Sequence, residues 1–240
     1  METLISINNK FFKDSPAAKW EDKWKSIDGK GLIDGFELYV DIKNNEDMSY
    51  AGEIISKFKH NNWNLQIHGI DLAGYELNEG KNYRKLLDSY LRLVKSLDKK
   101  VKITFHPIVK SNSPKVVSLN ETYNSLYELC SEVERYDYPF EICVENLNKL
   151  NGVTRLNTFE LSPLLEIKNL SLCWDIGPED HYPFYFGKTD LKKSLSCLKE
   201  GKYQGGIVLE IALDYLKGNN FDEKIRELYS FIEKEYSPLI

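Results

Sequence analysis

The chain has 240 residues, of which 42% are hydrophobic and 29% are charged, and its formal net charge is −5. This composition is ordinary for a globular protein, and the length suits one large domain or two small ones. The acidic balance disfavours a nucleic-acid-binding protein, and no apolar run approaches the roughly 18 residues of a membrane span. The four cysteines include no Cys-x-x-Cys pair, which argues against a zinc ribbon or a disulfide framework. The N-terminus leads directly into a strand-like run with no signal-peptide pattern, so we expect a cytoplasmic protein.

Strand-like and helix-like segments alternate along the whole chain. The predicted strands are short runs of β-branched, aromatic and aliphatic residues, at 4–8, 35–40, 63–68, 101–106, 140–145, 170–175 and 207–211. The predicted helices lie between them, at 16–27, 48–60, 83–97, 118–135, 162–167, 190–198 and 221–235. Residues 118–121 read Ser-Leu-Asn-Glu, the pattern of a capping box at a helix start. This alternation predicts a parallel sheet covered by helices, in a single domain over residues 1–240.

The number of strand–helix units suggests an α/β protein of the (β/α)8 TIM-barrel class. Such a barrel takes about 250 residues, so this one would be slightly short. Between Asp175 and Asp190 there is no room for a full helix, a strand and a turn, and at most residues 184–186 form a short strand. We therefore expect an irregular or missing unit of helix 6 and strand 7. The aromatic loop 182–186 either covers a pocket or fills the space of the missing helix.

Five of the predicted strands carry, as their last residue or the one before it, a residue that can bind a metal or move a proton. These residues are His68, His106, Glu145, Asp175 and Glu210. Such a side chain is costly to bury unless it is paired or bound to a metal. Because the carboxyl ends of all strands in a parallel barrel open onto one face, we expect the five to converge on one polar centre. Two imidazoles and three carboxylates form a mixed nitrogen and oxygen set that suits zinc, manganese or a similar divalent ion.

Simpler interpretations of the same residues remain open. His68 and His106 are also compatible with core histidines whose hydrogen bonds are satisfied. Glu145 and Glu210 are compatible with salt bridges to an arginine or lysine inside the barrel. Asp175 is compatible with a residue that caps a loop.

The order of these strand ends resembles the xylose-isomerase-like barrel superfamily, which includes endonuclease IV and many sugar isomerases and epimerases. The resemblance covers the whole chain in topology and five positions in motif. The matching pieces are His68-Gly69, His106-Pro107, Glu145-Asn146, Asp175-x-Gly177 and Leu209-Glu210-Ile211. The five in order, each on its own strand, are more specific than any single piece.

The resemblance implies a role for each of these positions. Glu145 would anchor the metal site, with Asp175 and Glu210 as further ligands. In the epimerase branch, the positions of Glu145 and Glu210 also form the catalytic acid/base pair on either side of the substrate carbon. His68 and His106 match the two histidines that hold a metal together with the glutamate in endonuclease IV. In isomerases, the corresponding histidines more often line the pocket and touch the substrate.

The chain also departs from the family pattern. Many members carry a histidine three residues after the sixth-strand aspartate, and Pro178 stands at that position here. His181 lies three residues further on, where it is either a substitute that contacts substrate or a residue of a surface loop. Trp174, beside Asp175, would form a wall of the substrate pocket. Because the chain has only four histidines, at least one usual metal ligand is missing and a three-metal nuclease site cannot be completed.

The leading hypothesis is a divalent-metal-dependent (Mn, Zn or Co) isomerase or epimerase of a small sugar, sugar phosphate or similar carbohydrate. Glu145 or Glu210 would take a proton from the carbon next to a carbonyl group. One alternative is a metal phosphodiesterase similar to endonuclease IV. Another is a degenerate, non-catalytic barrel that binds a small ligand or a partner. The expected partner is a small carbohydrate-like molecule, with no membrane and no nucleic acid, and the sequence leaves open whether copies pair into a homo-oligomer.

Overall fold

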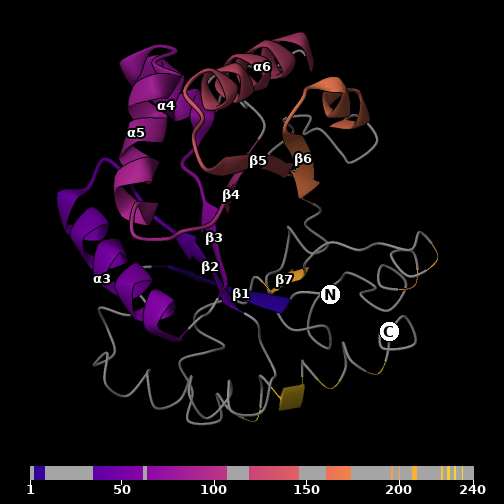
Figure 1. Ribbon diagram of the computed structural model, residues 1–240. Helices are drawn as coiled ribbons and strands as arrows, with labels where there is room; N and C mark the ends of the chain where they lie inside the picture. The colour runs from indigo at the N-terminus through magenta and orange to yellow at the C-terminus, as the bar shows by residue number, and fades with distance from the viewer. Residues whose placement is uncertain are drawn as a thin grey trace. The chain divides into compact units, whose positions relative to one another are not determined.

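The computed structural model describes residues 3–8, 35–61, 64–106, 119–145, 161–173 and 207–209, together with a few isolated residues between 196 and 234 (Figure 1). The chain divides into two compact units, Met1–Glu37 with Ile176–Ile240, and Leu38–Asp175. A single domain over residues 1–240 therefore stays a prediction. No helix in the described part of the chain combines the length and the apolar composition that a bilayer crossing requires.

In the smaller unit, the first strand pairs with the last described strand. Strand β1 (Thr3–Asn8) runs parallel to β7 (Ile207–Leu209), with Leu4 opposite Val208. Leu4 is buried. Both strands lie where the sequence predicts them, at 4–8 and 207–211. A parallel pairing of the first and last strands is what a closed barrel requires.

In the larger unit, four parallel strands follow one another in chain order. They are β3 (Asn64–His68), β4 (Val101–Phe105), β5 (Phe140–Glu145) and β6 (Leu170–Cys173). Strand β2 (Gly35–Tyr39) ends in the same unit. Each strand begins within one residue of its predicted start, because runs of Ile, Val, Phe and Leu favour buried strands. The sequence predicts that His106 is the last residue of its strand. In the structure, β4 ends at Phe105 and His106 follows directly after it.

Residues that lie opposite one another on β3, β4, β5 and β6 form rows across the sheet, and two successive rows differ in polarity. One row is apolar and consists of Ile67, Ile103, Ile142 and Leu170. The next row carries polar groups and consists of His68, Thr104, Cys143 and Ser171. Because successive side chains of a strand point to opposite faces, the two rows define an apolar face and a polar face of this sheet.

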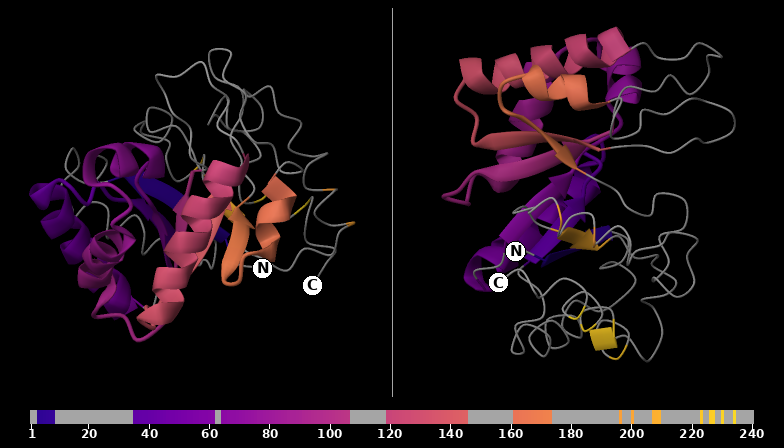
Figure 2. Two further views of the ribbon diagram at one scale, coloured as in Figure 1. Left: turned by 90° about the horizontal axis from the view of Figure 1, so that it is seen from above. Right: turned by 90° about the vertical axis from the view of Figure 1, so that its right-hand side faces the viewer.

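Three helices cover the apolar face as one layer, α3 (Asn45–Asn61), α5 (Tyr83–Val94) and α6 (Leu119–Arg135) (Figures 1 and 2). The ring of Tyr90 on α5 contacts Phe105, which lies on the same face as Ile103. Leu86, Leu87 and Tyr90 are buried, which confirms the apolar stripe predicted for this helix. The helix ends at Val94, earlier than the predicted residue 97.

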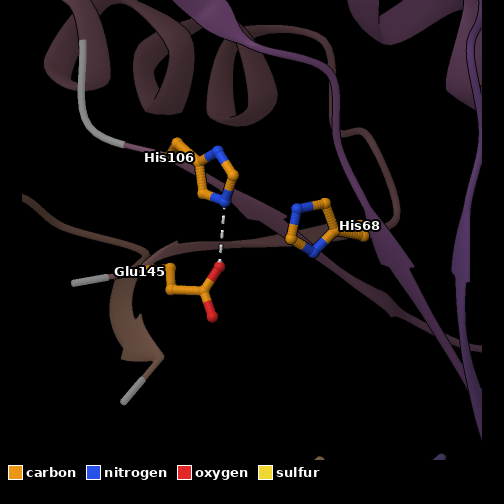
Figure 3. Close-up of side chains that lie close together, drawn as sticks. All are labelled: His68, His106 and Glu145. Atoms are coloured by element: carbon orange, nitrogen blue, oxygen red, sulfur yellow. Dashed lines mark ion pairs between the residues drawn. The ribbon is translucent and has the colours of Figure 1, made fainter. Parts of the chain in front are cut away.

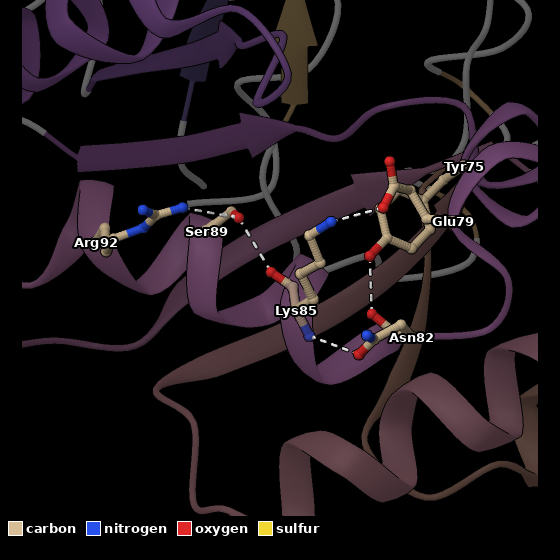
Figure 4. A network of polar contacts seen from close by, with 6 residues as sticks. All are labelled: Tyr75, Glu79, Asn82, Lys85, Ser89 and Arg92. Atoms are coloured by element: carbon tan, nitrogen blue, oxygen red, sulfur yellow. Dashed lines mark hydrogen bonds and ion pairs between the residues drawn. The ribbon is translucent and has the colours of Figure 1, made fainter.

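A network of polar contacts at the start of α5 joins it to α4 (Leu72–Glu79), a helix that the sequence did not reveal (Figure 4). The Asn82 side chain caps α5 by accepting a hydrogen bond from the backbone N–H of Lys85 at 3.2 Å. The Tyr75 hydroxyl donates to the Asn82 carbonyl at 2.8 Å, and Lys85 Nζ lies 2.6 Å from Glu79 Oε2. The hydrogen bond from Lys85 lowers the pKa of Glu79. These contacts hold α5 in place relative to the β3–α4 segment.

The other predicted elements fall partly outside the described residues. The described part of the helix predicted at 162–167 is a 3-10 turn, η1 (Ser162–Glu166), that begins at the expected serine and proline. The predicted helices 16–27, 190–198 and 221–235 lie largely or wholly outside the described residues, as does the aromatic segment 182–186.

Candidate functional site

Three of the five predicted site residues lie together at the carboxyl ends of neighbouring strands (Figure 3). His68 is the last residue of β3, His106 follows the last residue of β4, and Glu145 is the last residue of β5. His106 Nε2 lies 3.2 Å from Glu145 Oε2. The imidazole rings of His68 and His106 meet edge to face, with centroids 5.0 Å apart.

The carboxylate of Glu145 is nearly withdrawn from solvent, since its side chain is 6% exposed, whereas that of His106 is 37% exposed. A buried carboxylate is costly unless a partner compensates its charge. His106 supplies that partner, as a neutral N–H donor or, when protonated, as a cation. The cluster is therefore reached from solvent on the side of His106.

Hydrogen bonds between β3 and β4 hold the two histidines at this separation. His68 is opposite Thr104 in the ladder, so it lies one pair before the end of β4. The side chain of Gln66 donates to the hydroxyl of Thr104 at 2.9 Å, and this bond is buried. A buried polar group is held firmly when it is hydrogen-bonded, because breaking the bond leaves both partners unsatisfied.

Tyr39 lies beside the cluster and was not predicted from the sequence. It is the last residue of β2, and its ring centroid is 5.6 Å from that of His68. Its side chain remains well exposed. Partial burial of the ring, and then the negative charges of Asp41, Asp71 and Asp47, raise the pKa of Tyr39. The available signal was its position at a strand end, but a tyrosine there is common in packing.

The donor set of the cluster fits a divalent metal ion. The side chains of His68, His106 and Glu145 each offer one ligand atom, and these atoms all lie within 4.8 Å of one another. Two imidazoles and one carboxylate are ligands that zinc and similar ions accept. Three protein ligands with a further position open to solvent are typical of catalytic rather than structural zinc sites.

The remaining predicted site residues lie outside the part of the chain that the structure describes. They are the ligands Asp175 and Glu210 and the substrate-contact residues Trp174 and His181. Strand β6 is described as far as Cys173, which is opposite Glu145 in the ladder. The convergence of all five strand-end residues on one centre therefore stays a prediction beyond the first three.

Comparisons with known proteins agree with this topology. No family model and no curated protein matches the chain. Among solved structures, a D-tagatose 3-epimerase-like protein matches with a TM-score of 0.65 and 17% identity, covering 98% of both chains. A D-psicose 3-epimerase crystallised in the presence of D-fructose matches with a TM-score of 0.68 and 13% identity, covering 98% of this chain and 99% of the other.

A third solved structure belongs to a different class of enzyme. The family 2 AP endonuclease of Brucella melitensis matches with a TM-score of 0.54 and 14% identity, covering 98% of this chain and 88% of the other. At such low identities these matches establish the fold and leave the activity open. Together with the parallel strands and covering helices, they confirm the predicted fold: the chain folds as a TIM barrel.

Proposed function

We propose that this protein is a divalent-metal-dependent isomerase or epimerase that moves a proton next to the carbonyl group of a small carbohydrate. The observation that carries the proposal is the cluster of His68, His106 and Glu145 at adjacent strand ends, where barrel enzymes have their active sites. The similarity in fold to a D-psicose 3-epimerase and to a D-tagatose 3-epimerase-like protein supports the carbohydrate substrate class.

In the proposed mechanism, the carboxylate of Glu145 takes a proton from the carbon beside the carbonyl. The electron pair of the broken C–H bond moves toward the carbonyl oxygen and gives an enediolate, and Glu210 returns a proton to the opposite face of that carbon. His106, at 3.2 Å from Glu145, orients the carboxylate. A divalent ion held by His68, His106 and Glu145 would supply positive charge that stabilises the anionic form of the substrate.

A metal phosphodiesterase is the second candidate, because the trio of two histidines and a glutamate also resembles the endonuclease IV pattern. The fold similarity to a family 2 AP endonuclease is consistent with it. The net charge of −5 counts against a DNA substrate. Salt-dependent binding to a duplex that contains an abasic site would move the assignment to this candidate.

The deciding experiment compares Glu145→Gln with Glu141→Gln, a matched change on the same strand. Glu141 accepts a hydrogen bond from Ser171 at 2.9 Å and is not part of the cluster. We expect near-stoichiometric manganese, zinc or cobalt in the wild type and in Glu141→Gln, with epimerisation of D-fructose, D-tagatose or D-psicose. Glu145→Gln should lose turnover by roughly 100-fold or more, as expected for removal of a catalytic base.

Two results would contradict the proposal. Full turnover in Glu145→Gln would show that this carboxylate is not the base. A wild type that takes up no metal after supplementation and turns over none of the ketoses would favour the degenerate, non-catalytic barrel. The cytoplasmic location and the pairing of copies into a homo-oligomer stay predictions.

A further inference from the structure

One buried tyrosine contacts the neighbours of both imidazoles of the site. Tyr90 lies on α5 and is fully buried. Its hydroxyl oxygen accepts a hydrogen bond at 2.9 Å from the backbone N–H of Ile70, two residues after His68. Its ring packs edge to face against Phe105, with centroids 6.1 Å apart, and Phe105 immediately precedes His106. A single side chain thus bridges the ends of β3 and β4.

The turn after His68 is packed closely against the same phenylalanine. The N–H of Gly69 donates to the carbonyl oxygen of Thr104 at 2.7 Å. A Cβ atom at Gly69 would lie 2.4 Å from Cε1 of Phe105, a distance that real Cβ contacts do not reach. The backbone directly after β3 therefore approaches Phe105 as closely as only a glycine permits.

The hydrogen bond of Tyr90 completes this arrangement. Ile70 is 7% exposed, so bulk water is poorly placed to satisfy its N–H if the hydroxyl is removed. An unsatisfied buried N–H is unfavourable, and the turn would move to find another partner. Since His68 is two residues away, such a movement changes the position of its imidazole relative to that of His106.

We propose that Tyr90 is a positioning residue that sets the separation of the His68 and His106 imidazoles. It does so by holding the turn after His68 with its hydroxyl and by supporting Phe105 with its ring. This inference rests on the proposed function, because the separation matters for activity when the two imidazoles share one ion. Tyr90 acts through its neighbours and takes no part in the reaction itself.

The same helix offers a matched control. Tyr83 lies seven residues before Tyr90, is 2% exposed, and donates its hydroxyl to Glu76 on α4. Tyr83→Phe and Tyr90→Phe each remove one buried phenol oxygen from α5. If Tyr90 served only the stability of the helix layer, the two changes would have similar consequences at the site.

The experiment measures Co²⁺ binding by calorimetry and the imidazole nitrogen chemical shifts of His68 and His106 by NMR in the metal-free protein. For Tyr90→Phe we expect affinity to fall roughly tenfold, at the lower end of the effects seen when groups that orient metal ligands are lost. We also expect the shifts of both imidazoles to change. Tyr83→Phe should leave affinity and shifts as in the wild type.

Wild-type affinity and unchanged imidazole shifts in Tyr90→Phe would overturn the inference. If the wild type binds no ion, the proposed metal site fails, and the shifts in the metal-free protein alone decide the role of Tyr90. If Tyr90→Phe does not fold, Phe105→Leu replaces it, with Phe140→Leu on β5 as its control. The same weakening or shift change is then expected for Phe105→Leu, and its absence again overturns the inference.

Discussion

The two faces of the β3–β6 sheet are both buried, but they are buried in different ways. On the apolar face, Ile67, Ile103 and Ile142 are each 0% exposed and pack under the helix layer. On the polar face, Thr104 is also 0% exposed, and it accepts a hydrogen bond from Gln66. Burial alone therefore does not distinguish the core from the site.

The difference lies in what each face needs. Apolar side chains need only close packing, and they gain free energy from the surface that they remove from water. Buried polar side chains need specific partners at hydrogen-bond distance. The polar face thus supplies directional contacts that lead up to His68, His106 and Glu145, and the apolar face supplies most of the stability. Substitutions on each face test this division.

Ile103→Ala should have the largest effect, because it removes a fully buried side chain from the centre of the apolar face. We expect the free energy of unfolding to fall by about 2–5 kcal/mol, through lost transfer free energy and the cavity left behind. Urea denaturation measures the change. A loss of less than about 1 kcal/mol would mean that the helix layer does not pack on this face as described.

Gln66→Leu should cost less, about 1–3 kcal/mol, because it leaves the hydroxyl of Thr104 without its buried donor. Thr104→Val should act in the same way on the amide of Gln66. The double variant should lose less than the sum of the single variants, since both partners are then apolar. Strictly additive losses in urea denaturation would show that this hydrogen bond does not couple the two strands.

The burial of Cys130 in the helix layer predicts how the stability of the protein depends on pH. It is buried on α6, and burial raises the pKa of its thiol from 9.0 to about 12. Above about pH 9 the thiol loses its proton in the unfolded protein but keeps it in the folded protein. The stability that the protonated thiol contributes is therefore fully present below about pH 9 and is lost as the pH rises toward 12. Between about pH 8 and pH 10, the wild type should lose about 1 kcal/mol more than Cys130→Ala. Parallel pH profiles of the two proteins would contradict this.

The strands and the longer helices could be predicted because their local signals are strong. Val101–Phe105 and Phe140–Glu145 are short segments rich in β-branched and aromatic residues, and Leu119–Arg135 begins within a capping box. Helix Leu72–Glu79 was missed, since it is short, contains Gly74 and has few apolar residues in helical register. The Asp71 side chain, which accepts a hydrogen bond from Gly74 N–H at 3.1 Å, marks its start.

For the site, the residue types could be predicted and the grouping of His68, His106 and Glu145 followed from the parallel topology. The roles of Tyr39 and Tyr90 could not. A tyrosine at a strand end or in the apolar stripe of a helix carries no mark of what its ring or hydroxyl touches. Their contacts with His68, Ile70 and Phe105 depend on strand register and helix placement, which involve residues far apart in the chain.

The alternation of strands and helices is encoded in the amino-acid sequence, and with it the polar residues that stand at the carboxyl ends of strands. This information is local, because a strand is specified by a few consecutive residues. Only the tertiary structure decided that His106 lies 3.2 Å from Glu145 and that one tyrosine bridges two strand ends. Such distances result from packing between segments distant in sequence, where a shift of one residue in register would turn each side chain to the opposite face.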